Sequence, residues 1–206
     1  MKKILVITAL TLLVAAPAMS ATIKGSKHDL SNAVSNWGND YDRICALCHT
    51  PHEASTTALN APLWNRTYDP TVVTNIYNAV STTNAVFDLA SYRATDAPLC
   101  LSCHDGSSMT DALVNPPNNG DTGVQFNITG DANLGGDLGN DHPIGFNYAA
   151  VQTIEGAAGL HASPGLVFYD GIMWCSTCHD VHDPANTPFL AAPNDQSALC
   201  LTCHNK

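Results

Sequence analysis

Residues 45–52 read Cys-Ala-Leu-Cys-His-Thr-Pro-His, and residues 175–182 repeat this pattern as Cys-Ser-Thr-Cys-His-Asp-Val-His. Each stretch is followed by a shorter unit, Leu-Cys-Leu-x-Cys-His, at residues 99–104 and 199–204. The chain therefore contains Cys-x-x-Cys-His four times. These motifs use all eight cysteines, namely Cys45, Cys48, Cys100, Cys103, Cys175, Cys178, Cys200 and Cys203.

The Cys-x-x-Cys-His spacing is typical of c-type haem attachment. Two thiols at this spacing can add to the vinyl groups of one haem, while the adjoining imidazole binds its iron. A disulfide framework or zinc knuckles would also use paired cysteines, but neither needs the histidine. A histidine follows the second cysteine in all four motifs, although only 9 of the 206 residues are histidine. We therefore expect four haem c groups, with His49, His104, His179 and His204 as the proximal iron ligands.

The first twenty residues have the pattern of a secretory signal peptide. Lys2 and Lys3 precede an apolar run at residues 4–16, and Ala18 and Ser20 suit a cleavage site. The run is too short to span a membrane, and no later stretch approaches the required length. We predict that residues 1–20 are removed and that the chain is exported without a transmembrane segment.

The charge balance is strongly acidic. Eight Lys and Arg face eighteen Asp and Glu, which gives a formal net charge of −10. Such a surface repels nucleic acid and anionic headgroups, so no nucleic-acid partner is expected.

The repeat predicts one tetrahaem domain over residues 21–206. It contains a first haem-pair repeat at about 21–114, an irregular loop at about 115–142 and a second haem-pair repeat at about 143–206. So short a chain cannot enclose four haems in a conventional core, and much of the apolar burial should be against porphyrin. The predicted fold is mostly coil with short α-helices and a minor β-hairpin, organised around four covalently bound haems.

Two local patterns predict regular structure. Asp69 can cap a helix with Pro70 in its first turn, and an apolar stripe follows at Val72, Val73, Ile76, Ala79 and Val80. Residues 166–169 and 172–174 flank Asp170-Gly171, which is a two-residue turn signal for a short hairpin.

Five histidines lie outside the motifs and could fill the sixth iron position: His28, His52, His142, His161 and His182. His52 and His182 occupy equivalent positions of the repeat, His142 precedes a proline, and His161 has the weakest context. Because this supply covers four irons, we expect bis-histidine haems with no open substrate position. That expectation favours an electron-transfer protein over an enzyme.

The doubled unit, together with residues 27–31, 62–66 and 141–145, resembles the doubled-CxxCH family of multihaem c-type cytochromes. The size and motif number further resemble the extracellular tetrahaem filament cytochromes within that family. The resemblance implies His28, His52, His142 and His182 as the distal ligands, with His161 left over. It also implies a head-to-tail homopolymer in which one haem takes a histidine from the neighbouring subunit. His28, close to the mature N-terminus, is our candidate for that ligand.

The implied function is long-range electron transfer at the cell surface or outside the cell, between redox partner proteins and extracellular acceptors such as ferric oxides. A soluble periplasmic shuttle with the same haems but no polymer is the main alternative. A multihaem reductase is a further alternative, which would need an open or unusually ligated iron.

Overall fold

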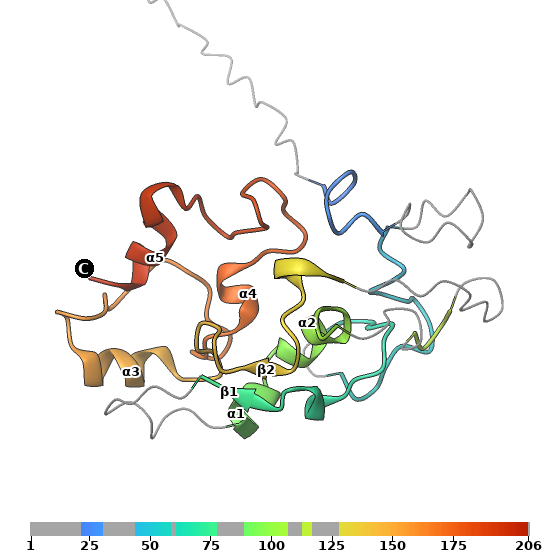
Figure 1. Ribbon diagram of the computed structural model, residues 1–206, viewed down its shortest axis with the longest axis horizontal. Helices are drawn as coiled ribbons and strands as arrows, with labels where there is room; N and C mark the ends of the chain where they lie inside the picture. Colours follow the sequence, from blue (N-terminus) through green and yellow to red (C-terminus); the bar gives the residue numbers. More distant parts are fainter. Residues whose placement is uncertain are drawn as a thin grey trace, which may run out of the picture.

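A computed structural model of the chain describes residues 22–30, 44–58, 61–77, 89–106, 113–116 and 128–205. Within these ranges most residues lie in turns, bends and irregular segments, with a few short helices and a small sheet (Figure 1). This confirms the expectation of a mostly irregular chain. The predicted signal peptide lies outside the described residues. Over the part that is described, no helix is long and apolar enough to cross a membrane.

The helices are short, and three of them carry cysteine motifs. The α-helices are α1 (Leu89–Arg93), α2 (Ala97–His104), α3 (Tyr148–Glu155), α4 (Cys175–Cys178) and α5 (Ala198–Cys203). Three-residue 3-10 turns occur at η3 (Pro70–Val72), η6 (Gly130–Ala132) and η7 (Asp195–Ser197). The second, third and fourth motifs lie in or at the ends of α2, α4 and α5.

The predicted helix from Asp69 to Val80 is wrong over its described part. Asp69 does cap the first turn, since its side chain accepts a hydrogen bond from the Thr71 amide at 2.8 Å, but η3 ends at Val72. The chain then becomes extended and enters β1 (Asn75–Ile76), while residues 78–80 lie outside the described ranges. Tertiary contacts favour the extended conformation over a helix, because the carbonyl of fully buried Val73 accepts two hydrogen bonds from the Arg93 guanidinium. The β-branched residues of this stretch also suit an extended chain.

The sheet differs from the predicted hairpin. β1 pairs in parallel with β2 (Asp137–Leu138), so it joins the first repeat to the segment between the repeats. The hairpin signal at residues 166–174 yields a single antiparallel bridge, Tyr169 to Ile172. Its turn has the expected form, because Asp170 and Gly171 both have positive φ, at 53° and 77°. The turn is therefore present, but the strands beside it are not.

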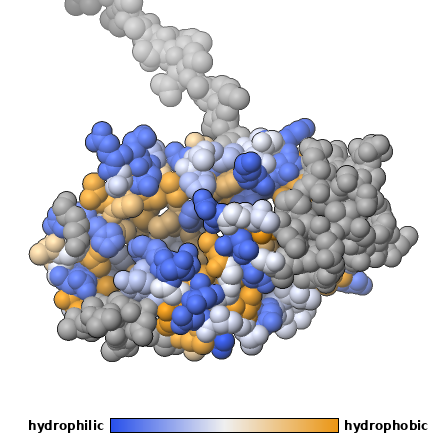
Figure 2. All heavy atoms as spheres, in the orientation of Figure 1, coloured by the Kyte–Doolittle hydropathy of each residue, from blue (hydrophilic) through white to orange (hydrophobic). Residues whose placement is uncertain are grey.

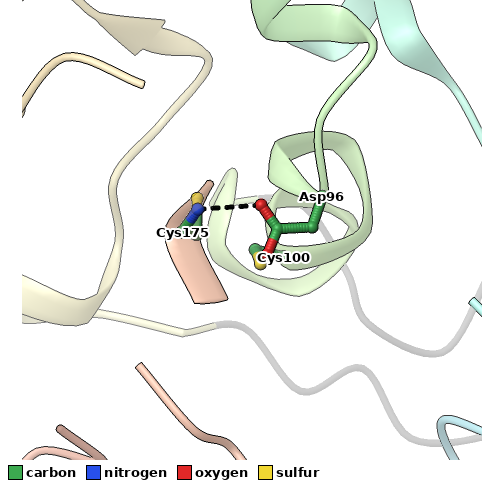
Figure 3. Close-up of side chains that lie close together, drawn as sticks. All are labelled: Asp96, Cys100 and Cys175. Carbon is green, nitrogen blue, oxygen red and sulfur yellow. Dashed lines mark hydrogen bonds between the residues drawn. The ribbon is translucent and has the colours of Figure 1, made fainter. Parts of the chain in front are cut away.

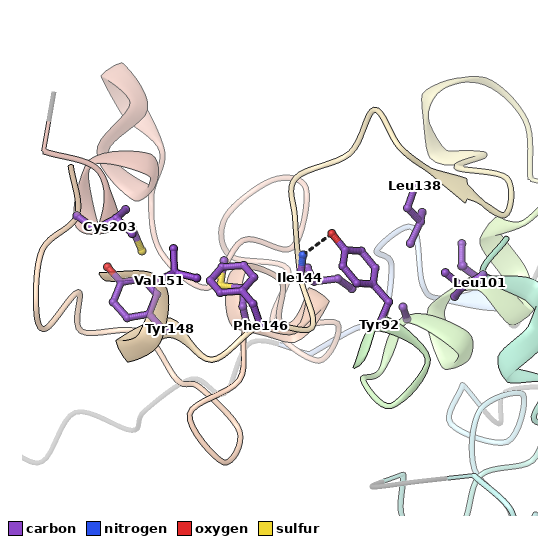
Figure 4. Close-up of a cluster of buried hydrophobic side chains, with 12 residues drawn as sticks. Tyr92, Leu101, Leu138, Ile144, Phe146, Tyr148, Val151 and Cys203 are labelled. Carbon is purple, nitrogen blue, oxygen red and sulfur yellow. Dashed lines mark hydrogen bonds between the residues drawn. The ribbon is translucent and has the colours of Figure 1, made fainter. Parts of the chain in front are cut away.

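The buried apolar side chains form an elongated row and not a compact centre (Figure 4). The row extends from Leu101 in α2 and Leu138 in β2, through Ile144 and Phe146, to Cys203 in α5. Tyr92 is fully buried within it, and its hydroxyl accepts a hydrogen bond from the Ile144 amide at 3.0 Å. This row connects the two repeats through the segment that follows His142.

Gly145 allows that segment to pass close to α1. Its φ is +71°, and a Cβ at this position would lie 2.8 Å from the Tyr92 nitrogen. Only glycine combines this backbone conformation with so close an approach.

Large hydrophobic side chains remain exposed next to the motifs. Leu63, Val181 and Leu201 are 53%, 44% and 43% exposed, and hydrophobic residues interrupt the hydrophilic surface in Figure 2. Val181 precedes His182, and Leu201 lies inside the fourth motif. Apolar surface beside the attachment cysteines is what packing against a porphyrin requires.

We expect Tyr92→Phe to destabilise the protein by about 1–3 kcal/mol, because the buried Ile144 amide loses its acceptor. The matched control is Tyr169→Phe, which removes a hydroxyl from a side chain that is 44% exposed. Thermal unfolding of the purified protein measures both. Equal melting temperatures for the two variants would contradict this role of Tyr92.

Candidate haem sites

Each Cys-x-x-Cys-His motif forms a single helical turn. The histidine amide donates to the carbonyl of the first cysteine at 2.8 Å in the first motif, 3.0 Å in the third and 2.9 Å in the fourth. The second motif makes its turn inside α2. Residues three apart in such a turn share a face, so both sulfurs are presented on the side from which the following imidazole emerges.

In both repeats, a later segment of the chain packs in the same way against the first motif of the repeat, at residues 45–52 and 175–182. Trp64 forms an antiparallel bridge with His49, and Leu190 forms one with His179. Leu63 and Phe189, which precede these residues, both have positive φ, at 56° and 60°. Residues 62–65 and 188–191 are thus structural counterparts, although their sequences, Pro-Leu-Trp-Asn and Pro-Phe-Leu-Ala, share only the proline.

These returning segments orient the proximal imidazoles. His49 Nδ1 lies 2.8 Å from the Pro62 carbonyl oxygen and His179 Nδ1 lies 3.1 Å from that of Pro188. His104 Nδ1 lies 2.6 Å from the carbonyl oxygen of Ala132. A carbonyl oxygen can only accept, so Nδ1 carries the proton in each ring and Nε2 is left free to bind a metal.

The structure brings three proximal histidines together with three of the predicted distal ones. The ring centroids are 6.1 Å apart for His28 and His104, and 6.1 Å apart for His49 and His182. They are 6.3 Å apart for His142 and His204. Two of these three pairs join residues from different repeats or from the N-terminal segment, so sequence spacing does not reveal them.

These separations fit a single metal ion between two imidazoles. A metal–nitrogen bond of about 2.0 Å and about 1.1 Å from that nitrogen to the ring centre place two such rings about 6.2 Å apart. His142 also bonds through Nδ1, to the Pro143 carbonyl oxygen at 2.9 Å, which leaves its Nε2 for the metal. The residues present therefore fit haem iron with two axial histidines.

His28 is half-buried and lies against other parts of its own chain, not on a free arm. Its ring packs on Phe189 at a centroid distance of 4.3 Å. Burial lowers the pKa of His28, and the neighbouring His104 lowers it further. His28 is therefore held as the neutral imidazole that a metal binds.

Among the described residues, no other histidine ring pairs with the predicted axial residues His52 and His179. Both are exposed, and no contact between their rings occurs among the described residues. His161 is also exposed, and its backbone has the structural role: its amide donates to the Cys203 carbonyl, and its carbonyl accepts from the Tyr148 hydroxyl.

The attachment cysteines of successive motifs lie close together. Burial, and after it the nearby Cys103 thiol, raises the pKa of Cys48 to about 12. Burial, and after it the nearby Cys203 thiol, raises the pKa of Cys178 to about 11. Sγ of Cys100 and Sγ of Cys175 lie within 4.8 Å of each other and of an Asp96 carboxylate oxygen (Figure 3). The four sites therefore follow one another in chain order, first to second, second to third and third to fourth.

Two further features suit a porphyrin at the first site. A cavity of about 470 Å³ is lined by Ile44, Cys45, Ala46, His49, Thr50, Pro51 and Leu63. The Trp64 indole nitrogen beside it is buried and has no hydrogen-bond partner within the part of the chain that the structure describes. The ring of Trp64 lies 6.0 Å from that of His49, edge to face. Because it lies so close to a proximal histidine, the indole N–H is placed to donate a hydrogen bond to a group bound at this site.

Arg66 makes a buried contact near the first two motifs that the sequence did not predict. Its side chain is 1% exposed, and its guanidinium donates to the Ser102 hydroxyl at 2.9 Å and to the Ser102 carbonyl at 2.5 Å. It thereby ties the segment after the first motif to α2, and its charge lowers the pKa of both the Cys48 and the Cys103 thiol. Its position close to residues 62–65 in the sequence could have drawn attention to it. Its contact with α2 could not have been predicted, because Ser102 is 36 residues away.

Residues 169–206 match the family model described as the doubled CXXCH motif. The doubled CXXCH motif found here covers the turn at Asp170, α4 and α5, and so the third and fourth motifs. It indicates covalently bound haem c and supports a multihaem c-type cytochrome that takes part in electron transfer. No curated protein matches this chain.

We expect His28→Ala to open the sixth position of one haem, because the described fold holds no second imidazole against His104. The reduced variant should bind carbon monoxide at one haem per chain, as seen in its difference spectrum. His161→Ala is the matched control and should bind none. Carbon monoxide binding that is the same in both variants would contradict the His28–His104 pair.

Proposed function

We propose that this protein is a tetrahaem c-type cytochrome that conducts electrons over long distances as the subunit of an extracellular filament. The observation that carries the proposal is the set of three imidazole pairs at 6.1–6.3 Å, each pair containing one proximal histidine. Four attachment motifs on one chain of 206 residues support the count of four haems.

The electron-carrying centre is the haem iron, which alternates between the ferric and ferrous states when haem is bound. The eight motif cysteines would bind the porphyrins, and the paired histidines would bind the irons. Backbone carbonyls of Pro62, Ala132 and Pro188 fix the rings of His49, His104 and His179. Iron held by two histidines would keep its ligands in both oxidation states, which suits electron transfer and not substrate turnover.

The order of the sites supports conduction along the chain. Neighbouring sulfurs belong to the first and second, second and third, and third and fourth motifs. The His49–His182 pair also crosses from the first motif to the segment after the third. These contacts tie all four sites into one continuous group.

The two exposed axial histidines suggest how subunits connect. We assign His52 of one subunit as the distal ligand of the His179 haem of the next, because neither ring pairs with another histidine ring among the described residues, whereas three other histidine pairs form. This replaces the earlier candidate His28, whose ring lies against His104 and Phe189 of its own chain. The assignment makes the polymer head-to-tail.

The proposed location rests on the predicted signal peptide and on the resemblance to OmcE-like filament cytochromes. The acidic composition, with a formal net charge of −10, is consistent with an exported protein that meets cationic or mineral acceptors. Extracellular oxidants such as ferric oxides are the proposed final acceptors. A soluble periplasmic shuttle is the alternative and uses the same haems.

The direct test is cryo-electron microscopy of protein sheared from the cell surface, combined with intact mass and a pyridine haemochrome count. We expect helical filaments with four haems per chain. Dispersed periplasmic particles with four haems would support the shuttle and reject the filament. Fewer than four haems would reject the tetrahaem assignment.

We expect His52→Ala to abolish filaments and to leave one haem per chain without a sixth ligand. His28→Ala should instead retain filaments, because its haem lies within one subunit. Sedimentation and negative-stain imaging of both variants, with His161→Ala as the control, distinguish these outcomes. Intact filaments in His52→Ala would contradict ligation across the subunit interface.

A further inference from the structure

Asp96 is a buried acidic residue that none of the haem ligation uses. It precedes α2, is 8% exposed, and makes no side-chain hydrogen bond to its own helix. Its carboxylate instead accepts hydrogen bonds from two backbone amides of α4, those of Cys175 at 2.9 Å and Ser176 at 2.8 Å. The side chain thus connects the helices of the second and third motifs (Figure 3).

The carboxylate also lies beside both attachment sulfurs. A carboxylate oxygen of Asp96, Sγ of Cys100 and Sγ of Cys175 all lie within 4.8 Å of one another. Three such groups could hold a metal ion, but both sulfurs belong to Cys-x-x-Cys-His motifs, and thioether formation removes the thiolates that a metal would need. The lasting feature is a negative charge between two haem attachment points.

We propose that Asp96 is a positioning residue that also sets the reduction potentials of the second and third haems. Its two hydrogen bonds hold the first turn of α4 against α2, and so fix the two attachment points relative to each other. Its charge favours the ferric over the ferrous state at both haems, because one positive charge is lost on reduction. This inference rests on the proposed tetrahaem function.

A buried residue of opposite charge, Arg66, acts on the other cysteine of the second motif, Cys103. The Arg66 guanidinium is buried next to Cys48 and Cys103 and lowers the pKa of both thiols, against the larger effect of burial. The junction between the first and second sites therefore has a buried cation, and the junction between the second and third has a buried anion. Fixed charges of opposite sign make the haem environments unequal along the chain.

The test is Asp96→Asn, which keeps the size of the side chain and one acceptor oxygen but removes the charge. We expect two of the four midpoint potentials to rise in spectroelectrochemical titration. At a fixed electrode potential the ratio of reduced to oxidised haem should increase about tenfold at those sites, which is about 59 mV for a one-electron couple. Glu155→Gln, at the exposed end of α3, is the control for neutralising a surface carboxylate and should change the potentials much less.

Asp96→Glu separates charge from position and keeps the inference testable where Asp96→Asn fails to fold. It retains the charge but lengthens the side chain, so its potentials should stay near those of the parent while its melting temperature falls. Two results would overturn the inference. One is that the midpoint potentials of Asp96→Asn equal those of Glu155→Gln. The other is that the midpoint potentials of Asp96→Glu rise by about 59 mV, as expected for Asp96→Asn. The haem count is measured first in every variant: four haems with unchanged potentials reject the role of Asp96, whereas missing haems in the parent protein reject the proposed function.

Discussion

One backbone hydrogen bond organises each haem site, and the rest of the structure depends on it. The histidine amide donates to the carbonyl of the first cysteine and closes the motif into one helical turn. The turn alone leaves the imidazole free to rotate. A second contact, from Nδ1 to a carbonyl oxygen of a distant segment, fixes the ring in the described sites of His49, His104 and His179. The irregular segments that follow the motifs thus have a structural role, because they place these carbonyl oxygens against the histidine rings.

The same requirement explains the shape of the core. A chain that must return to each motif cannot also form long helices or a wide sheet, and its buried side chains make a narrow row that ends at an attachment residue, Cys203. Burial raises the pKa of the Cys48 thiol to about 12 and that of the Cys178 thiol to about 11. Apolar residues such as Leu63 and Leu201 remain exposed beside the motifs, where a bound porphyrin would cover them.

Sequence reasoning recovered the parts of the site that are local in the chain. The four motifs, the doubled arrangement and the reserve of extra histidines are all properties of short segments. It failed where a distant segment decides the conformation. Residues 69–76 have a helical pattern, yet Val73 is drawn into an extended conformation by Arg93 and by the parallel pairing with β2. The equivalence of Pro62 and Pro188 was also hidden, because positive φ at Leu63 and Phe189 has no signature in those residue types.

The sequence by itself determined four Cys-x-x-Cys-His motifs in a doubled arrangement, which indicate covalent haem c attachment, because this motif depends only on residue types at a fixed short spacing. Only the tertiary structure decided which imidazoles face each other. It put His28 against His104 and His182 against His49, and it placed Asp96 beside Cys100 and Arg66 against Ser102. The physical reason is that these relations join segments far apart in the chain. These contacts depend on which segments pack next to each motif, and no short sequence pattern encodes that packing.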